Sequence, residues 1–299
     1  MVAIVTDSTC DLSPELIQQY NIKVIPLHIH FGGQSYIDNI NISQDEFYAK
    51  LTSENTPHPS TSPPSVEEFH EFYTKLVPDH DNIISIHISS SLSHTYKHAM
   101  RAVNRGRRRF LTERLKVKRF NKLHIRVIES NNVSLGAGIL VLYAAKWAQQ
   151  GMSGAQIEKQ ALAIRERLRI VFTVNELTYM RRSEKVSALK HFLGSLLGIN
   201  PVIEGAKSAL SPVKSAKGID HAMQFIAEHT LKNIDLFKFN TILVSEIGGN
   251  NKPHFKALSQ YLKTQDIDKL SKQIPCNIGP SVGTHAGPGG VAVAFIAKK

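Results

Sequence analysis

The sequence predicts an α/β protein of two domains, an N-terminal domain with a mainly parallel sheet and a C-terminal α+β domain. Two observations predict this fold class. Apolar runs rich in Val and Ile alternate with helical patterns in the first half of the chain, as in βαβ units. The chain has 299 residues, which is long for one domain and suits two. We place the boundary at Gly151, so that the domains are residues 1–151 and 152–299.

The expected strands are short β-branched runs that polar or turn residues bound on both sides. In chain order they are residues 2–5, 23–31, 83–88, 124–128, 170–174, 241–244 and 291–296. The last three fall in the second half, where strands and helices alternate less regularly, and this irregularity favours an α+β arrangement there.

Serine residues mark where the expected helices begin. A Ser followed three residues later by Glu or Gln can form a capping box, and this pattern occurs at Ser43, Ser65 and Ser153. Ser13 precedes Pro14, which is the favoured order of an N-cap residue and the first helical residue. Residues 138–150 read as a mostly apolar helix that Gly151 stops.

Composition excludes several classes of protein. With 42% hydrophobic and 20% charged residues, the chain has the composition of a globular protein. No apolar run approaches the roughly 20 residues that a membrane span needs. The N-terminus lacks the basic segment of a signal peptide. The two cysteines, Cys10 and Cys276, make no disulfide framework and fit a reducing compartment, so we expect a cytoplasmic protein.

Most of the positive charge lies in one segment. Residues 101–126 hold eleven Lys or Arg against one acid, Glu113, while the whole chain has a net charge of +11. This basic segment can be a solvated helix or hairpin, a nucleic-acid contact, or a contact with an anionic membrane. Five interleaved apolar residues permit an amphipathic patch: Phe110, Leu111, Leu115, Val117 and Phe120. Only two of them could stack on bases, which disfavours nucleic acid.

Three short stretches rich in Ser and Thr could bind an anion. They are residues 6–9, 57–65 and 89–95, and the first and last follow expected strands. Ligands of open α/β sheets bind beyond the carboxyl ends of strands, and hydroxyl and backbone N–H donors suit a carboxylate or a phosphate. The alternative is that these residues only form turns and helix caps.

A glycine-rich stretch near the C-terminus, VGTHAGPGG at residues 282–290, offers a second kind of anion site. Glycines free the backbone to present N–H groups as an anion nest, and His285 adds a donor whose charge responds to pH. The alternative is a flexible connector into the last strand.

Motifs of common enzymes are missing. The sequence has no GxSxG, GxxxxGK[ST], HExxH or CxxC pattern, and the GSLLG run at residues 194–198 has the wrong spacing for a nucleophile elbow. His28 and His30 share one face of a strand without a third metal ligand. His87 could pair with a Ser of the loop after it, yet no acid is oriented onto it. We therefore expect no catalytic residue, metal or cofactor.

Taken in order, several segments resemble the DegV family of bacterial fatty-acid-binding proteins. They are IVTDST at 4–9, VIPL at 24–27, TSPPS at 61–65, ISSSLSHTY at 88–96, Glu129-Ser130 and GTHAGPG at 283–289. Together they span nearly the whole chain. Three features depart from the family pattern: His94 replaces a glycine, the segment from Met180 to Val186 lacks the family's glycines, and the basic segment resembles an insertion.

The resemblance implies that a long-chain fatty acid lies between the two domains. Its carboxylate would be held by Thr61, Ser93 and His285, with Ser62 and His94 as further donors. The protein would be a carrier and not an enzyme, and would present the acyl group to a partner fatty acid kinase that makes acyl-phosphate. The second hypothesis is an enzyme acting on a phosphorylated molecule, with the His285 loop as its phosphate site.

Overall fold

The computed structural model describes residues 2–54, 57–189, 199–248, 253–264 and 272–299. Its strands form a four-stranded, a six-stranded and a three-stranded sheet. The GSLLG run at residues 194–198 lies outside the described residues.

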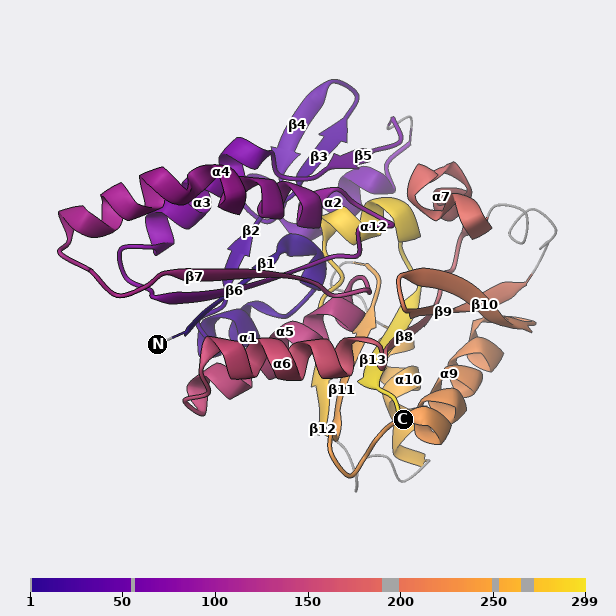
Figure 1. Cartoon of the computed structure of the whole chain (residues 1–299). Helices are drawn as coiled ribbons and strands as arrows, with labels where there is room; N and C mark the ends of the chain where they lie inside the picture. Colours follow the sequence, from indigo (N-terminus) through magenta and orange to yellow (C-terminus); the bar gives the residue numbers. More distant parts are fainter. Residues whose placement is uncertain (1, 55–56, 190–198, 249–252, 265–271) are drawn as a thin grey trace.

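The four-stranded sheet of the N-terminal half is parallel throughout, as the alternating pattern predicts. Its strand order is β2 (Lys23–Ile25), β1 (Val2–Asp7), β6 (Asn82–His87) and β7 (His124–Glu129). Helices α3 (Val66–Leu76) and α4 (Thr95–Lys116) cover one face, while α5 (Leu135–Gln149) and α6 (Gly154–Arg165) cover the other (Figure 1).

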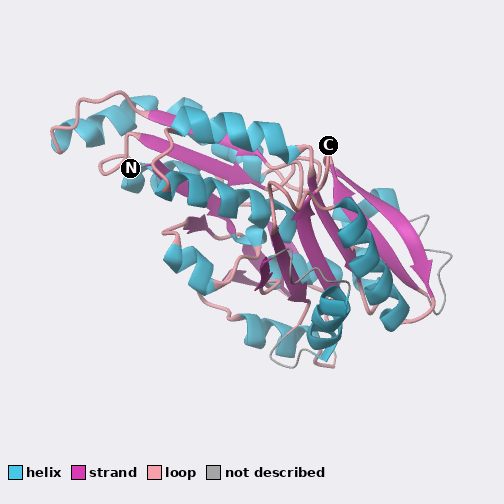
Figure 2. Cartoon of the chain, turned by 90° about the horizontal axis from the view of Figure 1, so that it is seen from below, coloured by secondary structure: helices cyan, strands magenta, loops and turns pink. Residues whose placement is uncertain are grey.

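The six-stranded sheet of the C-terminal half is mixed, as the α+β prediction requires. Its order is β10 (Ala209–Ala216), β9 (Asn200–Ala206), β8 (Leu168–Thr173), β13 (Val291–Ile296), β11 (Thr241–Glu246) and β12 (Lys272–Pro275). Only β11 and β12 pair in parallel. Helices α9 (Ile219–Asn233) and α10 (Pro253–Thr264) pack on its outer face, and Figure 2 shows helices along the outside of both halves.

Helix α5 joins the two halves. It packs against β1 and β6 of the parallel sheet and against β8, β11 and β13 of the mixed sheet. A helix between two layers must be apolar on all sides, because no face of it meets water. This position explains the mostly apolar sequence of residues 138–150, and one hydrophobic core runs through α5 from one sheet to the other.

The prediction of one strand at residues 23–31 is wrong. Pro26 has a fixed φ and no N–H, so it ends the β-ladder after Ile25. The chain resumes as β3 (His28–Phe31) in the small antiparallel sheet, between β4 (Gln34–Ile37) and β5 (Ser60–Ser62). Strand β5 lies in the stretch that sequence patterns assigned to a loop, and its pairing with β3 fixes the backbone of Thr61.

The predicted helix caps are confirmed. Ser43, Ser65 and Ser153 form capping boxes at the starts of α2 (Gln44–Leu51), α3 and α6, and Ser13 caps α1 (Pro14–Gln19). Helix α6 follows the proposed boundary at Gly151 but packs on β6 and β7 of the first sheet. The division at that residue stays a prediction.

The basic segment forms the greater part of α4, then a loop, then β7. Two of its large side chains, those of Phe110 and Arg114, are buried, which their sequence context did not indicate. Phe110 is 1% exposed against Tyr73 and His70, and Arg114 is 1% exposed with its guanidinium 2.6 Å from Asp81. The hairpin interpretation is therefore wrong. In the described parts of the chain, no helix combines the length and apolar character that a membrane crossing requires.

Candidate functional site

A pocket lies between the two halves of the molecule. Its volume, with its open side included, is about 850 Å³. Ends of β1, β6 and β5 contribute lining residues from the first half, and β8, β10, β13 and α12 (Pro280–Ala286) contribute them from the second. Most lining side chains are apolar, and seven are polar: Thr9, Thr61, Ser93, Ser134, Lys185, Ser281 and His285.

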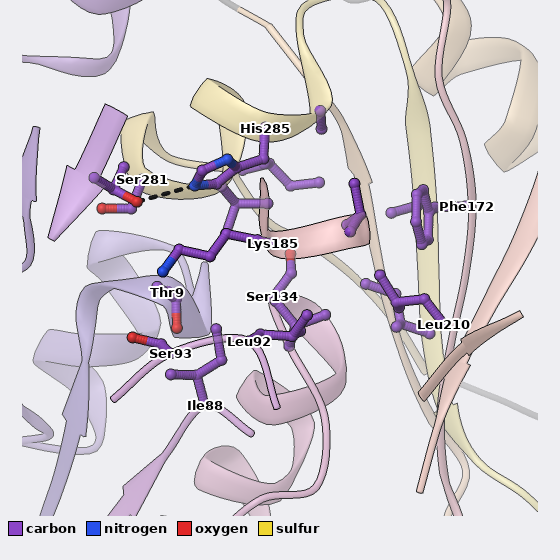
Figure 3. A pocket seen from close by; sticks show the side chains of 18 of the residues that line it. Thr9, Ile88, Leu92, Ser93, Ser134, Phe172, Lys185, Leu210, Ser281 and His285 are labelled. Carbon is purple, nitrogen blue, oxygen red and sulfur yellow. Dashed lines mark hydrogen bonds between the residues drawn. The ribbon is translucent and has the colours of Figure 1, made fainter. Parts of the chain in front are cut away.

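The pocket has two unlike ends (Figure 3). Ser281, His285, Lys185, Thr9 and Ser93 gather toward one end, whereas Phe172 and Leu210 lie toward the other. Such a cavity matches an elongated molecule with a polar head and an apolar tail.

The three residues predicted as the main ligands, Thr61, Ser93 and His285, all line the pocket. Each comes from a different part of the fold. Thr61 is held on β5, Ser93 lies in the loop between β6 and α4, and His285 lies in the last turn of α12. Thr61 and His285 meet directly, since the Thr61 hydroxyl oxygen is 2.9 Å from His285 Nε2.

His285 is held from both sides of its ring. Opposite Thr61, the ring atom Nδ1 lies 2.9 Å from the hydroxyl of Ser183. The same hydroxyl oxygen accepts a hydrogen bond from the backbone N–H of Lys185. The Ser183 hydroxyl can therefore donate its proton to Nδ1, which then acts as an acceptor. We assign the ring proton to Nε2 for this reason. His285 then donates to Thr61, whose own hydroxyl proton can point at a ligand.

Three of the seven polar side chains are already engaged elsewhere. The Thr9 hydroxyl donates to Asp7, the Ser134 hydroxyl to Asp11 and the Ser281 hydroxyl to Asp38. All three carboxylates are buried. With those protons committed, and with the ring proton of His285 given to Thr61, the donors that face a ligand are the Thr61 hydroxyl and the Lys185 amine. The Ser93 hydroxyl lies 2.8 Å from that of Thr95, and either of the two can be the donor.

Two buried aspartates hold α12 in place. Asp11 accepts the backbone N–H of Gly279 at 2.8 Å, just before the helix, and Asp38 accepts the hydroxyl of Ser281 in its first turn. Burial raises the pKa of both carboxyls, and the hydrogen bonds oppose that rise. The first half of the chain thereby fixes the helix that carries His285.

Two other predicted ligands do not reach the pocket. Ser62 is the neighbour of Thr61 on β5, and its hydroxyl lies 2.8 Å from Nε2 of His30 instead. His94 is exposed at the start of α4, where its ring lies 6.1 Å from that of His98 between centroids. Neither side chain lines this pocket in the described structure, and their role as ligands stays a prediction.

The glycine-rich stretch does not form the expected anion nest. His285 belongs to α12 and not to a loop, and the glycines after it use their N–H groups internally. Gly287 donates to the carbonyl of Gly283 at 2.8 Å, and Gly289 donates to that of Ile247 at 2.6 Å. Both have a positive φ, which only glycine adopts at little cost. These glycines turn the chain from α12 into β13, and the phosphate-site hypothesis loses its donors.

His87 has an acid partner that sequence patterns did not indicate. Its Nδ1 lies 2.9 Å from the carboxylate of Asp7, and its Nε2 lies 2.7 Å from the hydroxyl of Ser85, not from a Ser of the loop after it. All three side chains are at most 1% exposed. The buried Ser–His–Asp chain ties β1 to β6.

Metal ligation has no support in the described part of the chain. No group of three or more His, Cys, Asp or Glu side chains is arranged there to hold an ion. His28 lies 2.9 Å from Glu68, and His30 contacts Ser35 and Ser62.

Comparison with known proteins gives the family. A family model described as "Uncharacterised protein, DegV family" matches residues 1–298. The chain belongs to the DegV family. A DegV domain-containing protein of Caldanaerobacter subterraneus subsp. tengcongensis is 30% identical over 297 residues, which cover 99% of each chain.

Solved structures of other family members share the fold. DegV of Bacillus subtilis, described as a fatty acid binding protein, superposes with a TM-score of 0.81 at 24% identity and 99% coverage of both chains. A stearic acid-binding protein of Eubacterium ventriosum superposes with a TM-score of 0.86 at 22% identity, covering 100% of this chain and 99% of the other. The predicted fold class is thus confirmed for this DegV chain.

One site residue of this DegV chain, Lys185, escaped the sequence patterns. It follows Ser183 in the segment that departs from the family pattern, and its amine points into the pocket toward Thr9 and Ser93 (Figure 3). The usable signal was the basic character of residues 181–185, since a cation strengthens the hydrogen bonds to an anion.

The stability of this DegV chain should depend on His285 at mildly acid pH. Burial and the charge of Lys185 lower the pKa of His285 from 6.5 to about 4. Between these values the unfolded chain binds a proton that the folded chain does not, so stability falls as the pH falls. From pH 7 to pH 5 this group should cost about 2 kcal/mol. Urea unfolding at both pH values should show a smaller loss for His285→Asn, and equal losses would contradict the assignment.

Proposed function

We propose that this protein binds a long-chain fatty acid between its two sheets, with the carboxylate among Thr61, Ser93, His285 and Lys185. One observation carries the proposal: these four polar side chains line a pocket that is otherwise mostly apolar, while its other hydroxyls serve buried aspartates. A phosphate ester of a small polar molecule would leave the apolar end without a partner, whereas a fatty acid occupies both ends.

Simple energetics support this ligand. Burying an alkyl chain contributes about 0.8 kcal/mol per methylene, so a chain of about sixteen carbons has a gross driving force of about 12 kcal/mol. Each charge-assisted hydrogen bond to a carboxylate contributes roughly 1.5–3 kcal/mol. The hydroxyls of Thr61 and Ser93 and the amine of Lys185 can therefore offset the desolvation of the carboxylate, with His285 orienting Thr61.

The relatives support the same conclusion. Solved structures from Bacillus subtilis and Thermus thermophilus are described as fatty acid binding, and one from Ruminococcus gnavus carries vaccenic acid. This chain has their fold, and the three family positions named from the resemblance line its pocket.

We further propose that the protein is a carrier and that a fatty acid kinase is its partner. Its pocket offers hydrogen-bond donors and one cation, and the ring nitrogen of His285 that faces Thr61 carries a proton in our assignment, so it is not placed to act as a base on that hydroxyl. Arg181 and Arg182 lie exposed at the end of α7 (Leu177–Arg182), four and three residues before Lys185. An ATP-dependent partner that phosphorylates the carboxylate would approach this cationic edge, and an acidic surface on it would be complementary.

Solvent extraction of the purified protein, followed by mass spectrometry, tests the binding proposal. We expect close to one long-chain fatty acid per protein. A variant with Thr61→Val and His285→Ala, purified in parallel, should carry far less. An empty extract together with no binding in a titration with palmitate and oleate would overturn the proposal.

Loss of the Lys185 charge should weaken binding. Lys185→Met is expected to lower palmitate affinity about tenfold at low salt, since the partly exposed amine forms a screened ion pair with the carboxylate. Fluorescence displacement titrations at low and high salt measure this effect. Lys185→Arg is the matched control and should stay within about twofold of the unmodified protein. Equal affinities for the Met and Arg variants would show that the amine does not face the ligand.

A further inference from the structure

The far end of α4 carries an unusual concentration of exposed apolar side chains. Leu111, Leu115, Val117 and Phe120 are 58%, 59%, 53% and 78% exposed. They are four of the eight large apolar side chains that are exposed among the described residues. We name residues 107–122 the α4 tip. Single exposed apolar residues are ordinary on a protein surface, but a group within ten positions calls for a partner.

The same tip is strongly cationic. Its exposed basic residues are Arg107, Arg108, Arg109, Lys116, Lys118 and Lys122. Lys116 pairs with Glu113. Within the described parts of the chain, the three consecutive arginines form no ion pair. Arg114 and Arg119 differ, because both turn inward to Asp81 and fix the helix end to the body.

Helical spacing mixes the two kinds of side chain on one face. Arg107, Leu111 and Leu115 follow one another at four-residue intervals, so they form one exposed stripe, and Arg108 adjoins it. The loop after the helix continues the surface with Val117 and Phe120. Aliphatic side chains flanked by arginines are the pattern of a helix that lies in a membrane interface.

We propose that the α4 tip docks onto the surface of an anionic lipid bilayer. Its cations complement the negative surface potential of such a bilayer, and its four apolar side chains can enter the headgroup region. Nucleic acid fits less well. Single-stranded nucleic acid is bound by stacking on aromatic side chains, and of the two candidates Phe110 is 1% exposed, so only Phe120 remains. Exposed leucines contribute nothing to phosphate contacts.

The position of the tip separates docking from ligand binding. Helix α4 begins at Thr95, two residues after the pocket residue Ser93, and runs away from α12 toward the outer end of the N-terminal half (Figure 1). At 1.5 Å per residue its 22 residues span about 33 Å. Docking would concentrate the protein at a bilayer while the polar end of the pocket stays one helix length away.

Vesicle flotation tests this proposal. The full chain is mixed with vesicles of phosphatidylcholine alone or with equal parts of phosphatidylglycerol, at low and high salt. We expect flotation only with phosphatidylglycerol, weakened by salt. Replacing Arg107, Arg108 and Arg109 by Gln should lower the partition coefficient about 100-fold. Replacing Leu111, Leu115 and Phe120 by Ser should lower it at least tenfold.

Matched controls exist elsewhere on the surface. Lys207, Lys217 and Lys256 are exposed cations of the second half, and Phe237 is 100% exposed. Their replacement by Gln and Ser should leave flotation unchanged. All variants should keep the thermal transition and the palmitate affinity of the parent, because the altered residues lie outside the core and the pocket.

Three results would overturn the proposal. One is no flotation with anionic vesicles at low salt. Another is equal loss in the tip and control variants, which would indicate diffuse charge attraction. The last is duplex or single-stranded oligonucleotide binding that is stronger than vesicle binding and is insensitive to the Ser replacements, which would assign the tip to nucleic acid.

Discussion

Replacing His285 by Ala is expected to lower palmitate affinity about 100-fold, which corresponds to about 2.7 kcal/mol. The ring does what Ala cannot do. Its N–H donates to the Thr61 hydroxyl at 2.9 Å, and this bond leaves the proton of that hydroxyl directed at the carboxylate. A carboxylate buried beside an alkyl chain needs those bonds, because unmet hydrogen-bonding capacity in an apolar site is costly. Isothermal titration with palmitate measures the loss.

Ser183→Ala separates the orientation of the ring from its presence. This variant keeps the imidazole but removes the partner of Nδ1, so the ring proton is no longer directed to Nε2. We expect a loss of about fivefold, clearly smaller than for His285→Ala. Thermal denaturation without ligand shows whether each variant is folded. Unchanged affinity in a folded His285→Ala variant would exclude the carboxylate site.

Replacing Leu210 by Trp is expected to discriminate between fatty acids by length. Leu210 is half-buried on β10 at the apolar end of the pocket (Figure 3). An indole there displaces about four methylenes of a bound chain, and each is worth about 0.8 kcal/mol. Stearate affinity should therefore fall by roughly 100-fold, whereas laurate, whose shorter chain ends before this position, should bind as before.

A Trp on the same strand outside the pocket serves as the control. Val213 is 36% exposed on β10 and does not line the pocket, so Val213→Trp should leave both affinities unchanged. An equal loss for stearate and laurate with Leu210→Trp would mean that the alkyl chain does not extend toward Leu210. Unchanged stearate affinity in Leu210→Trp would likewise show that the alkyl chain does not reach Leu210.

The sequence by itself determined the parts of this protein that depend on neighbouring residues. The capping boxes at Ser43, Ser65 and Ser153 are local hydrogen bonds, so four letters suffice to predict them. The parallel strands of the first half follow from apolar runs separated by helices. The apolar sequence of α5 predicted a buried helix. It did not predict that a second sheet covers the other side of this helix.

Strands with weak apolar patterns could not be predicted. Strand β10 is largely exposed and β5 has only three residues, so neither has an alternation that marks a strand. Their pairing with β9 and β3 decides their conformation. The break at Pro26 has a local cause. That the strands before and after it join different sheets is decided by the fold.

Only the tertiary structure decided which side chains form the site. Thr61 and Ser62 carry similar hydroxyls, but successive side chains of a strand point to opposite sides, so only Thr61 meets His285, 224 residues away. The hydroxyls of Thr9, Ser134 and Ser281 face the pocket yet serve buried aspartates. Donor types can be read from letters, whereas the direction and the partner of each donor are set by contacts between distant segments.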